Sequence, residues 1–220
     1  MKIVTDYRPS QTVLNRLRQV DFVAVIGPTA VGKTTLITAV LRKHPSARLI
    51  ITDTNRAPRP GERDGADYHF RSREAMFAHI KNREYVNLAP SVTGDLYASH
   101  PDSYPYKGTG IMAVLADAVP YFKSLPFRSF RQVFIVPPDW SVWQARMETH
   151  RFTPEQRARR LLEAKESLQY ALDGPDITFV INDDLDTAAA DLWHRMQNES
   201  DIAVQHAGRN IAAELLRNIQ

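Results

Sequence analysis

Short apolar runs alternate along the chain with segments in which apolar residues recur at helical spacing. The apolar runs have the length of buried strands and lie at residues 22–26, 48–51, 111–115, 132–136 and 177–181. The helical patterns cover residues 36–43, 116–124, 140–147, 154–172, 185–196 and 202–219. Strands that alternate with helices are typical of a parallel sheet with helices on both faces. The pattern therefore predicts an α/β fold with a parallel sheet wound by helices.

A different pattern occupies residues 52–99. Residues 52–65 are rich in Arg, Pro and Gly and have no apolar stripe, which is typical of either a mobile loop or a binding surface. They are followed by a predicted strand at 67–70, a helix at 72–82 with Ser72 as its N-cap, and a strand pair at 85–89 and 96–98. This region is therefore predicted to form a small lobe with mixed strands.

The loop after the first strand carries the most specific motif. It matches G-x-x-x-x-G-K-[ST] and consists of Gly27, Pro28, Thr29, Ala30, Val31, Gly32, Lys33, Thr34 and Thr35. Its glycines let backbone N–H groups turn towards phosphate oxygens, and the N-terminus of the following helix adds partial positive charge. Lys33 is predicted to reach the outer phosphates of ATP, and the Thr34 hydroxyl to hold Mg²⁺. With a strand before it and a helix after it, the motif predicts an ATP-binding loop.

Composition excludes several kinds of site. The 220 residues are 43% hydrophobic and 24% charged, as in soluble globular proteins, and the absence of cysteine excludes disulfides, thiolate metal sites and cysteine nucleophiles. A net charge of +3 does not indicate nucleic-acid binding, since an anionic small substrate explains a basic cluster equally well. No apolar run approaches the roughly 20 residues that span a bilayer, and no signal peptide is evident. A cytoplasmic protein without membrane or nucleic-acid partners is expected.

A second motif begins in the loop at residues 52–65, and through it the chain resembles the guanylate kinase family. Residues 54–62 read T-N-R-A-P-R-P-G-E and residues 65–70 read G-A-D-Y-H-F, similar to the family patterns T-T-R-x-P-R-x-G-E and G-x-D-Y-x-F. Further similar stretches are G-D-L-Y-A-S at 94–99 and V-I-N-D-D-L-D at 180–186. The resemblance covers roughly residues 22–196. It implies a kinase that uses ATP and Mg²⁺ to phosphorylate a nucleoside monophosphate.

The resemblance also implies roles for matched residues. The phosphate of the acceptor would be held by Arg56, Arg59, Tyr68 and Tyr97. Physical chemistry agrees, because two guanidinium groups a few residues apart can bind a dianionic phosphate. Further acceptor-site positions are Thr52, Asn87 and Ser99, and Asn182 would pack against the adenine of ATP. Catalysis would rest on Lys33, Arg146 and Arg160.

The implied organisation is a single domain of residues 1–220 with a core at about 21–197. Its parts are an acceptor lobe at about 52–99, a lid at about 149–158, an N-terminal arm outside the core at 1–20 and a C-terminal helical extension at 198–220. A further lid arginine falls at either His150 or Arg151, whereas Arg157 and Arg159 are interpreted as an exposed basic helix face. The sequence does not predict the oligomeric state.

Four positions depart from the family pattern. Asn87 replaces a glutamate that accepts hydrogen bonds from guanine, and Ala113 and Leu115 replace two aspartates of the strand I-L-D-I-D. Thr52 replaces a base-contacting serine and keeps the hydroxyl. Each lost charged hydrogen bond would cost about 1.5–3 kcal/mol of guanine binding. The phosphate-binding residues are therefore retained, while the guanine-reading carboxylates are not.

The best single hypothesis is a guanylate kinase-like enzyme that converts GMP and ATP to GDP and ADP. One alternative is a kinase for another phosphorylated acceptor, such as a ribose bisphosphate, which would explain a missing base reader. Another is a non-catalytic guanylate-kinase-like binding module. The intact Gly32, Lys33 and Thr34 disfavour the binding module, since modules of that kind usually have degraded phosphate loops.

Overall fold

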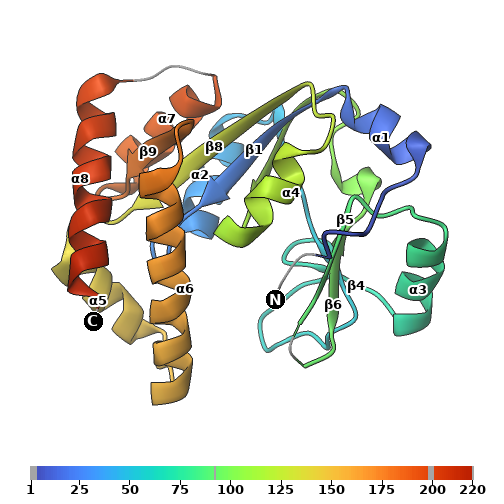
Figure 1. The fold of residues 1–220 in the computed structure, drawn as a ribbon, viewed down its shortest axis with the longest axis horizontal. Coiled ribbons are helices and arrows are strands. Elements are labelled where there is room, and N and C mark those ends of the chain that lie inside the picture. The colour runs from blue at the N-terminus through green and yellow to red at the C-terminus, as the bar shows by residue number, and fades with distance from the viewer. Residues whose placement is uncertain (1–3, 92, 198–200, 220) are drawn as a thin grey trace. The chain divides into compact units, whose positions relative to one another are not determined.

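The structure is a computed structural model that describes residues 4–91, 93–197 and 201–219 (Figure 1). The chain divides into two compact units. The first comprises Met1–Phe22, Ser46–Met112 and Asp117–Phe130, and the second comprises Val23–Pro45, Ala113–Ala116 and Arg131–Gln220. Parts of the predicted arm and of the C-terminal extension, at residues 1–3, 198–200 and 220, lie outside the described residues.

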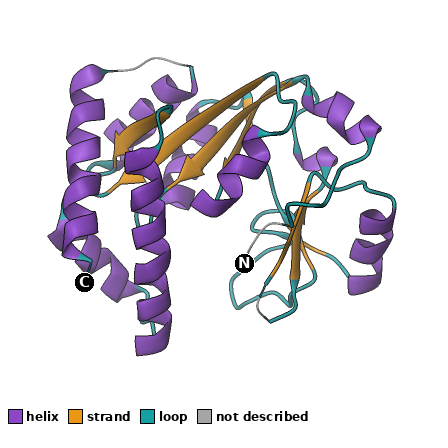
Figure 2. Cartoon of the chain, in the orientation of Figure 1, coloured by secondary structure: helices purple, strands orange, loops and turns teal. Residues whose placement is uncertain are grey.

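The apolar runs form a five-stranded sheet, whose strands are orange in Figure 2. Its strands are β1 (Val20–Ile26), β2 (Ala47–Leu49), β7 (Gly108–Ala113), β8 (Ser129–Val136) and β9 (Ile177–Ile181), in the order β2-β7-β1-β8-β9. Strand β2 pairs with β7, and β8 with β9, in parallel. The prediction of an α/β fold with a parallel sheet is confirmed.

The helices of the second unit were predicted from apolar residues at helical spacing, and capping side chains mark the start of some of them. They are α2 (Lys33–Lys43), α5 (Trp140–Thr149), α6 (Pro154–Asp173), α7 (Leu185–Met196) and α8 (Ile202–Asn218). Asp139 caps α5, and Thr153 and Gln156 form a capping box at the start of α6. Helices α6 and α8 run side by side in Figure 1. The core of this unit includes the fully buried Leu36, Val40 and Phe134.

The first unit contains a second, four-stranded sheet in the order β4-β3-β6-β5. Its strands are β3 (Asp53–Thr54), β4 (His69–Phe70), β5 (Asn87–Pro90) and β6 (Leu96–Ser99), with parallel and antiparallel pairs. Helix α3 (Arg73–Lys81), capped by Ser72 as predicted, contributes Met76 to a cluster with Leu96 and Ala98. Because side chains alternate along a strand, Tyr97 and Ser99 lie on the face opposite α3.

The rest of the first unit surrounds an aromatic cluster. Its elements are α1 (Gln11–Leu17), the 3₁₀ turn η1 (Pro101–Ser103) and α4 (Val119–Lys123), and the 3₁₀ turn η2 (Ala116–Ala118) precedes α4. Phe22 stacks on four aromatic rings, which are those of Tyr104, Phe122, Phe127 and Phe130. These rings form the apolar centre of the first unit.

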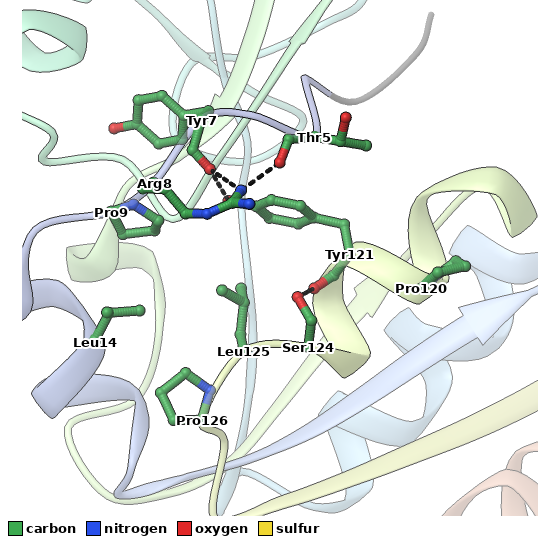
Figure 3. A pocket seen from close by; sticks show the side chains of 10 residues that line it. All are labelled: Thr5, Tyr7, Arg8, Pro9, Leu14, Pro120, Tyr121, Ser124, Leu125 and Pro126. Atoms are coloured by element: carbon green, nitrogen blue, oxygen red, sulfur yellow. Dashed lines mark hydrogen bonds between the residues drawn. The ribbon is translucent and has the colours of Figure 1, made fainter.

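The prediction that the N-terminal arm lies outside the core is wrong. Leu17 is fully buried, and the backbone N–H of Val4 donates to the Leu88 carbonyl. The Tyr7 hydroxyl accepts a hydrogen bond from the Tyr85 backbone. The arm thus satisfies polar groups around β5, and it lines a pocket with α4 that includes Tyr121 (Figure 3).

Two boundaries differ from the patterns. Strand β7 ends at Ala113, so Leu115 is not in a buried strand and is 43% exposed. The helical pattern at 116–124 divides into η2 and the short α4. Pro120 explains the division, because proline has no N–H to continue a helical ladder and is tolerated only in a first turn. No helix among the described residues is long and apolar enough to cross a membrane.

Candidate nucleotide-binding sites

The phosphate loop lies in the second unit, between β1 and α2. Gly32 is left-handed with a φ of 90°, and a Cβ there would lie 2.5 Å from the amide nitrogen of Asn182. A Cβ on Gly27, with a φ of 145°, would lie 2.5 Å from the Ile135 carbonyl oxygen. Both positions therefore require glycine, for backbone conformation and for space. The N-terminus of α2 follows directly, where free N–H groups favour anions.

Lys33 closes the loop on itself. Its Nζ donates to the carbonyl oxygens of Gly27 and Pro28, at 2.7 and 2.8 Å. Burial lowers the pKa of the Lys33 ammonium to about 8, repulsion from Arg160 acts in the same direction, and Glu163 opposes both. The two carbonyls hold the ammonium inside the loop, where it can exchange them for phosphate oxygens.

Two side chains from outside the loop fix its shape. The amide nitrogen of Asn182 donates to the Val31 carbonyl at 2.7 Å, and the indole of Trp143 donates to the Thr29 carbonyl at 2.9 Å. Asn182 was predicted only to pack against adenine, and this contact gives it a role in positioning the loop. Trp143 was missed, because a buried tryptophan on a helix reads from sequence as core.

The arginines of α5 and α6 also belong to the second unit. Arg146 has a buried Nη1 without a hydrogen-bond partner among the described residues. Arg160 forms an ion pair with Glu163 at 2.6 Å, a partner that the i,i+3 spacing could have revealed. Arg157 is partly buried and donates to Gln144, so its interpretation as exposed surface is wrong, whereas Arg159 is exposed. For Arg146, the unsatisfied buried nitrogen costs free energy unless an anion binds there.

The lid segment joins α5 to α6 through residues 150–153. Arg151 has a positive φ of 49°, and the exposed His150 ring stacks on Phe152. These contacts do not distinguish His150 from Arg151 as a phosphate-contacting residue. The lid therefore remains a prediction.

Thr34 lies in the first turn of α2 and is exposed. A hydroxyl at this point, beside the free N–H groups of the helix start, can serve as one oxygen ligand of Mg²⁺, which prefers oxygen donors. Ala113 and Leu115 supply no oxygen. Water and phosphate oxygens would have to complete the coordination.

The first unit holds the predicted acceptor-phosphate residues. The Arg56 Nη2 donates to both carboxylate oxygens of Glu62 at 2.9 Å, and its Nε donates to the Tyr97 hydroxyl at 3.1 Å. A third nitrogen, Nη1, donates to the Ala57 carbonyl at 2.7 Å. Most donors of Arg56 therefore have protein partners, and its role in binding the acceptor phosphate stays a prediction.

Glu62 orients this group, although sequence reasoning gave it no role. It also accepts from the Arg59 backbone N–H at 2.7 Å, and this bond, followed by the Arg56 guanidinium, lowers the pKa of the Glu62 carboxyl. The signal was present, since the glutamate ends the R-x-P-R-x-G-E motif. The side chain of Arg59 is left exposed.

Aromatic rings complete the surroundings of Arg56. Its guanidinium lies 5.3 Å from the ring centre of Tyr68 and 5.8 Å from that of Phe70. Burial raises the pKa of the Tyr68 phenol, so the hydroxyl keeps its proton at neutral pH and can donate. Arg56, Tyr68 and Tyr97 are thus brought together as predicted, with Tyr68 and Tyr97 rings 5.8 Å apart.

The predicted base-contacting position Asn87 is buried and already bonded. Its amide oxygen accepts from the backbone N–H of Ser99 at 3.1 Å and from the Ser99 hydroxyl at 2.5 Å. The Ser99 hydroxyl is also hydrogen-bonded to Tyr104 at 2.8 Å. Thr52 is partly buried, and its carbonyl accepts from His69. The acceptor oxygen expected to face a base is therefore engaged within the sheet.

A strand, a glycine-rich loop closed by Lys33 and a helix N-terminus define a P-loop phosphate-binding protein of the α/β class. The family model described as guanylate kinase matches residues 19–199, and the chain belongs to the guanylate kinase family. The expectation from the sequence motifs is confirmed.

Individual relatives of this chain are guanylate kinases as well. Guanylate kinase of Synechococcus elongatus is 38% identical over 173 residues, which cover 76% of this chain and 91% of the relative. That of Nocardia farcinica is 33% identical over 188 residues, covering 82% and 95%. A crystal structure of guanylate kinase from Anaplasma phagocytophilum covers 86% of this chain and 90% of its own, with a TM-score of 0.58. At 20% identity, that likeness supports the fold.

Proposed function

We propose that this protein transfers the γ-phosphoryl group of ATP to the phosphate of GMP, giving ADP and GDP. The observation that carries the proposal is the intact phosphate loop, with Lys33 held inside it, in a chain that also keeps Arg56, Tyr68 and Tyr97 together. The names of its relatives support the same reaction. ATP and a nucleoside monophosphate are the proposed partners, and the cytoplasm is the proposed location.

Each site has a separate task in this reaction. The loop N–H groups and Lys33 bind the β- and γ-phosphates of ATP, and the Thr34 hydroxyl would help to hold Mg²⁺. When bound, Mg²⁺ would supply charge neutralisation to the phosphates. Arg146 offers its unpartnered Nη1 to the transferred phosphoryl group, and Arg160 adds positive charge beside Lys33.

The acceptor phosphate is bound by two donors of the first unit. Arg59 supplies an exposed guanidinium, and the partly buried Tyr97 supplies a hydroxyl that accepts a hydrogen bond from the Arg56 Nε. Exclusion of water from the bound substrates would protect the phosphoryl group from hydrolysis. Positioning and charge neutralisation then account for most of the catalysis.

The base is the part of the acceptor least well specified. The amide oxygen of Asn87 accepts a hydrogen bond from Ser99, and the side chains of Ala113 and Leu115 have no hydrogen-bond acceptor. These observations favour a second candidate, a kinase for another phosphorylated acceptor such as a ribose bisphosphate. They also leave the binding-module alternative, which the intact loop disfavours.

An acceptor panel tests the proposed function. Steady-state kinetics with GMP, AMP, UMP and ribose phosphates should show that the wild type phosphorylates GMP, with weak discrimination against other monophosphates. Asn87→Glu and Leu115→Asp restore two of the three family carboxylates, and the double variant should raise kcat/KM for GMP by about 100-fold or more, since each restored charged bond is worth about 1.5–3 kcal/mol. Turnover of ribose phosphates alone would contradict GMP as the substrate. Absence of all turnover, with ATP bound, would favour the binding module.

We expect ATP binding to be coupled to protonation of Lys33. Below pH 8 the ammonium is already charged, so the affinity for ATP does not vary with pH through this group. Phosphate raises its pKa in the complex, so above pH 8 binding takes up a proton and affinity falls, by at most about tenfold per pH unit. Calorimetry at pH 7 and pH 9, in buffers of different ionisation enthalpy, measures the uptake. Lys33→Ala should show none, and equal proton uptake in both proteins would assign it elsewhere.

Removal of the Asn182 side chain should weaken ATP binding by about 10-fold. The change breaks one hydrogen bond to the Val31 carbonyl and leaves that buried oxygen unpaired, which costs about 1–2 kcal/mol. Asn182→Ala is compared with Asp183→Ala, the exposed neighbour, by titration with an ATP analogue. Unchanged affinity in Asn182→Ala would show that the loop keeps its shape without this bond.

A further inference from the structure

Two histidines and a glutamate converge in the first unit, next to α3. His79 lies in the last turn of α3, Glu84 follows in the loop before β5, and His100 comes directly after β6. One potential ligand atom from each of them lies within 4.8 Å of the others. The Nδ1 of His79 is 2.5 Å from a carboxylate oxygen of Glu84, and all three residues are partly buried.

This cluster is on the opposite face of the four-stranded sheet from the phosphate-binding residues. The Tyr85 ring packs in the α3 cluster with Met76 and Ala98. It contacts the His79 ring at 5.4 Å and the His100 ring at 5.8 Å between centres. Tyr97 points to the other face, since it alternates with Ala98 along β6. The cluster is therefore separate from the proposed kinase site.

We propose that His79, Glu84 and His100 form a binding site for one Zn²⁺ ion. Two imidazole nitrogens and a carboxylate are a donor set that zinc favours, whereas Mg²⁺ prefers oxygen ligands alone. In the metal-free protein, His79 and Glu84 share a proton, and zinc replaces that proton. Their ligand atoms then separate to roughly 3.3 Å, as zinc bonds of about 2.0–2.1 Å require. A water molecule fills the fourth position.

One neighbour of His100 suits a metal-bound histidine. Its Nδ1 lies 3.4 Å from a carboxylate oxygen of Asp102 and accepts a hydrogen bond from the Asp102 backbone N–H at 3.4 Å in the metal-free protein. Binding of zinc through Nε2 would move the ring proton to Nδ1, which then donates to the carboxylate. Histidine ligands usually donate their second N–H to such a carboxylate, which fixes the tautomer and the ring orientation. The ring is held further by Tyr85, whose hydroxyl donates to the buried Asp53 at 3.2 Å. The bound ion joins the end of α3 to the end of β6.

Zinc titration of the tag-free full-length protein, with a chromophoric chelator as competitor, tests the site. The wild type should bind one Zn²⁺ per chain with micromolar or tighter affinity. His79→Gln, His100→Gln and Glu84→Gln should each weaken binding by more than about 100-fold, and Asp102→Asn by about 10–100-fold. The matched controls are His206→Gln on α8 and Glu74→Gln on α3, both exposed, which should bind zinc as the wild type does.

Two further measurements use the same proteins. Bound Co²⁺ should give the intense visible absorption of a tetrahedral site in the wild type and lose it in His79→Gln. At a zinc concentration about 100-fold above Kd, the melting temperature should rise by about 5–10 °C in the wild type and the controls only. Circular dichroism checks that each variant is folded. If a histidine variant does not fold, zinc binding by Glu84→Gln is the measurement that tests the site. No saturable zinc binding, or binding lost only in the controls, would overturn the proposal. None of these readouts depends on kinase activity.

Discussion

Replacement of Lys33 by alanine should lower kcat/KM for ATP by about 1,000-fold or more. The ammonium is the only side-chain cation of loop residues 27–35, and it lies beside Gly27 and Pro28, where the outer phosphates are proposed to bind. Loss of one preorganised charged donor in a catalytic site costs about 10²–10³ in rate, and here ground-state binding of ATP is lost as well. Steady-state turnover with saturating GMP measures the effect.

The matched control for this variant is Lys43→Ala. Lys43 ends the same helix and pairs with Asp186 at an exposed position, so its removal should leave turnover within about twofold of the wild type. The melting temperature of Lys33→Ala should stay close to that of the wild type, which separates a catalytic loss from unfolding. Near-normal turnover by folded Lys33→Ala would refute an ATP-binding role for the loop.

Arg56→Ala should raise the KM for the acceptor by about 100-fold and leave ATP affinity unchanged. The guanidinium holds the Tyr97 hydroxyl, packs on Tyr68 and Phe70, and is itself fixed by Glu62. Its removal frees Tyr97 and unpairs a carboxylate, for a combined cost of about 2.7 kcal/mol. Kinetics with varied GMP at saturating ATP, and titration with an ATP analogue, measure the two effects.

Two variants sharpen this prediction. Arg63→Ala removes an exposed arginine of the same loop and should leave the acceptor KM unchanged. Glu62→Gln keeps the shape but weakens the bond to Arg56, so its KM should rise less than that of Arg56→Ala. An equal fall in ATP and acceptor affinity in Arg56→Ala would indicate general destabilisation rather than loss of a phosphate-binding group.

The sequence predicted the phosphate loop in full because its residue types follow from local backbone requirements. Gly27 and Gly32 have positive φ, and the strand and helix on either side are set by short-range patterns. The contacts that hold the loop are different. Trp143 and Asn182 are distant in the chain, and no local pattern shows that one indole and one amide reach the carbonyls of residues 29 and 31.

Residues for a proposed acceptor site could be named from the sequence, but their hydrogen bonds could not. The motif identified Arg56 and Arg59 as two similar groups, whereas the fold buries one against Glu62 and Tyr97 and leaves the other exposed. The same limit applies to Asn87. Its identity could be read from the sequence, but only the β5–β6 register shows that its amide oxygen accepts a hydrogen bond from Ser99.

The N-terminal arm shows why burial is hard to predict for a short polar segment. Residues 1–20 have few apolar side chains, but the two that matter, Val13 and Leu17, lie on one side of α1 and are buried. The backbone N–H of Val4 and the hydroxyl of Tyr7 add bonds around β5 that do not depend on hydrophobic patterning. The i,i+4 spacing of Val13 and Leu17 is only a short helical signal, and the bonds of Val4 and Tyr7 leave no periodic pattern.

The division of the chain into two units has a consequence for biosynthesis. The first unit takes its aromatic cluster from three separate stretches, with Phe22 in one, Tyr104 in the next and Phe122 in the last. On the ribosome, this cluster is incomplete until residue 130 has emerged, although Phe22 is made near the start. The next residue, Val23, belongs to the second unit, whose last stretch is Arg131–Gln220. Truncated chains that stop before residue 130 should therefore expose these rings and depend on chaperones, and no continuous fragment contains either unit alone.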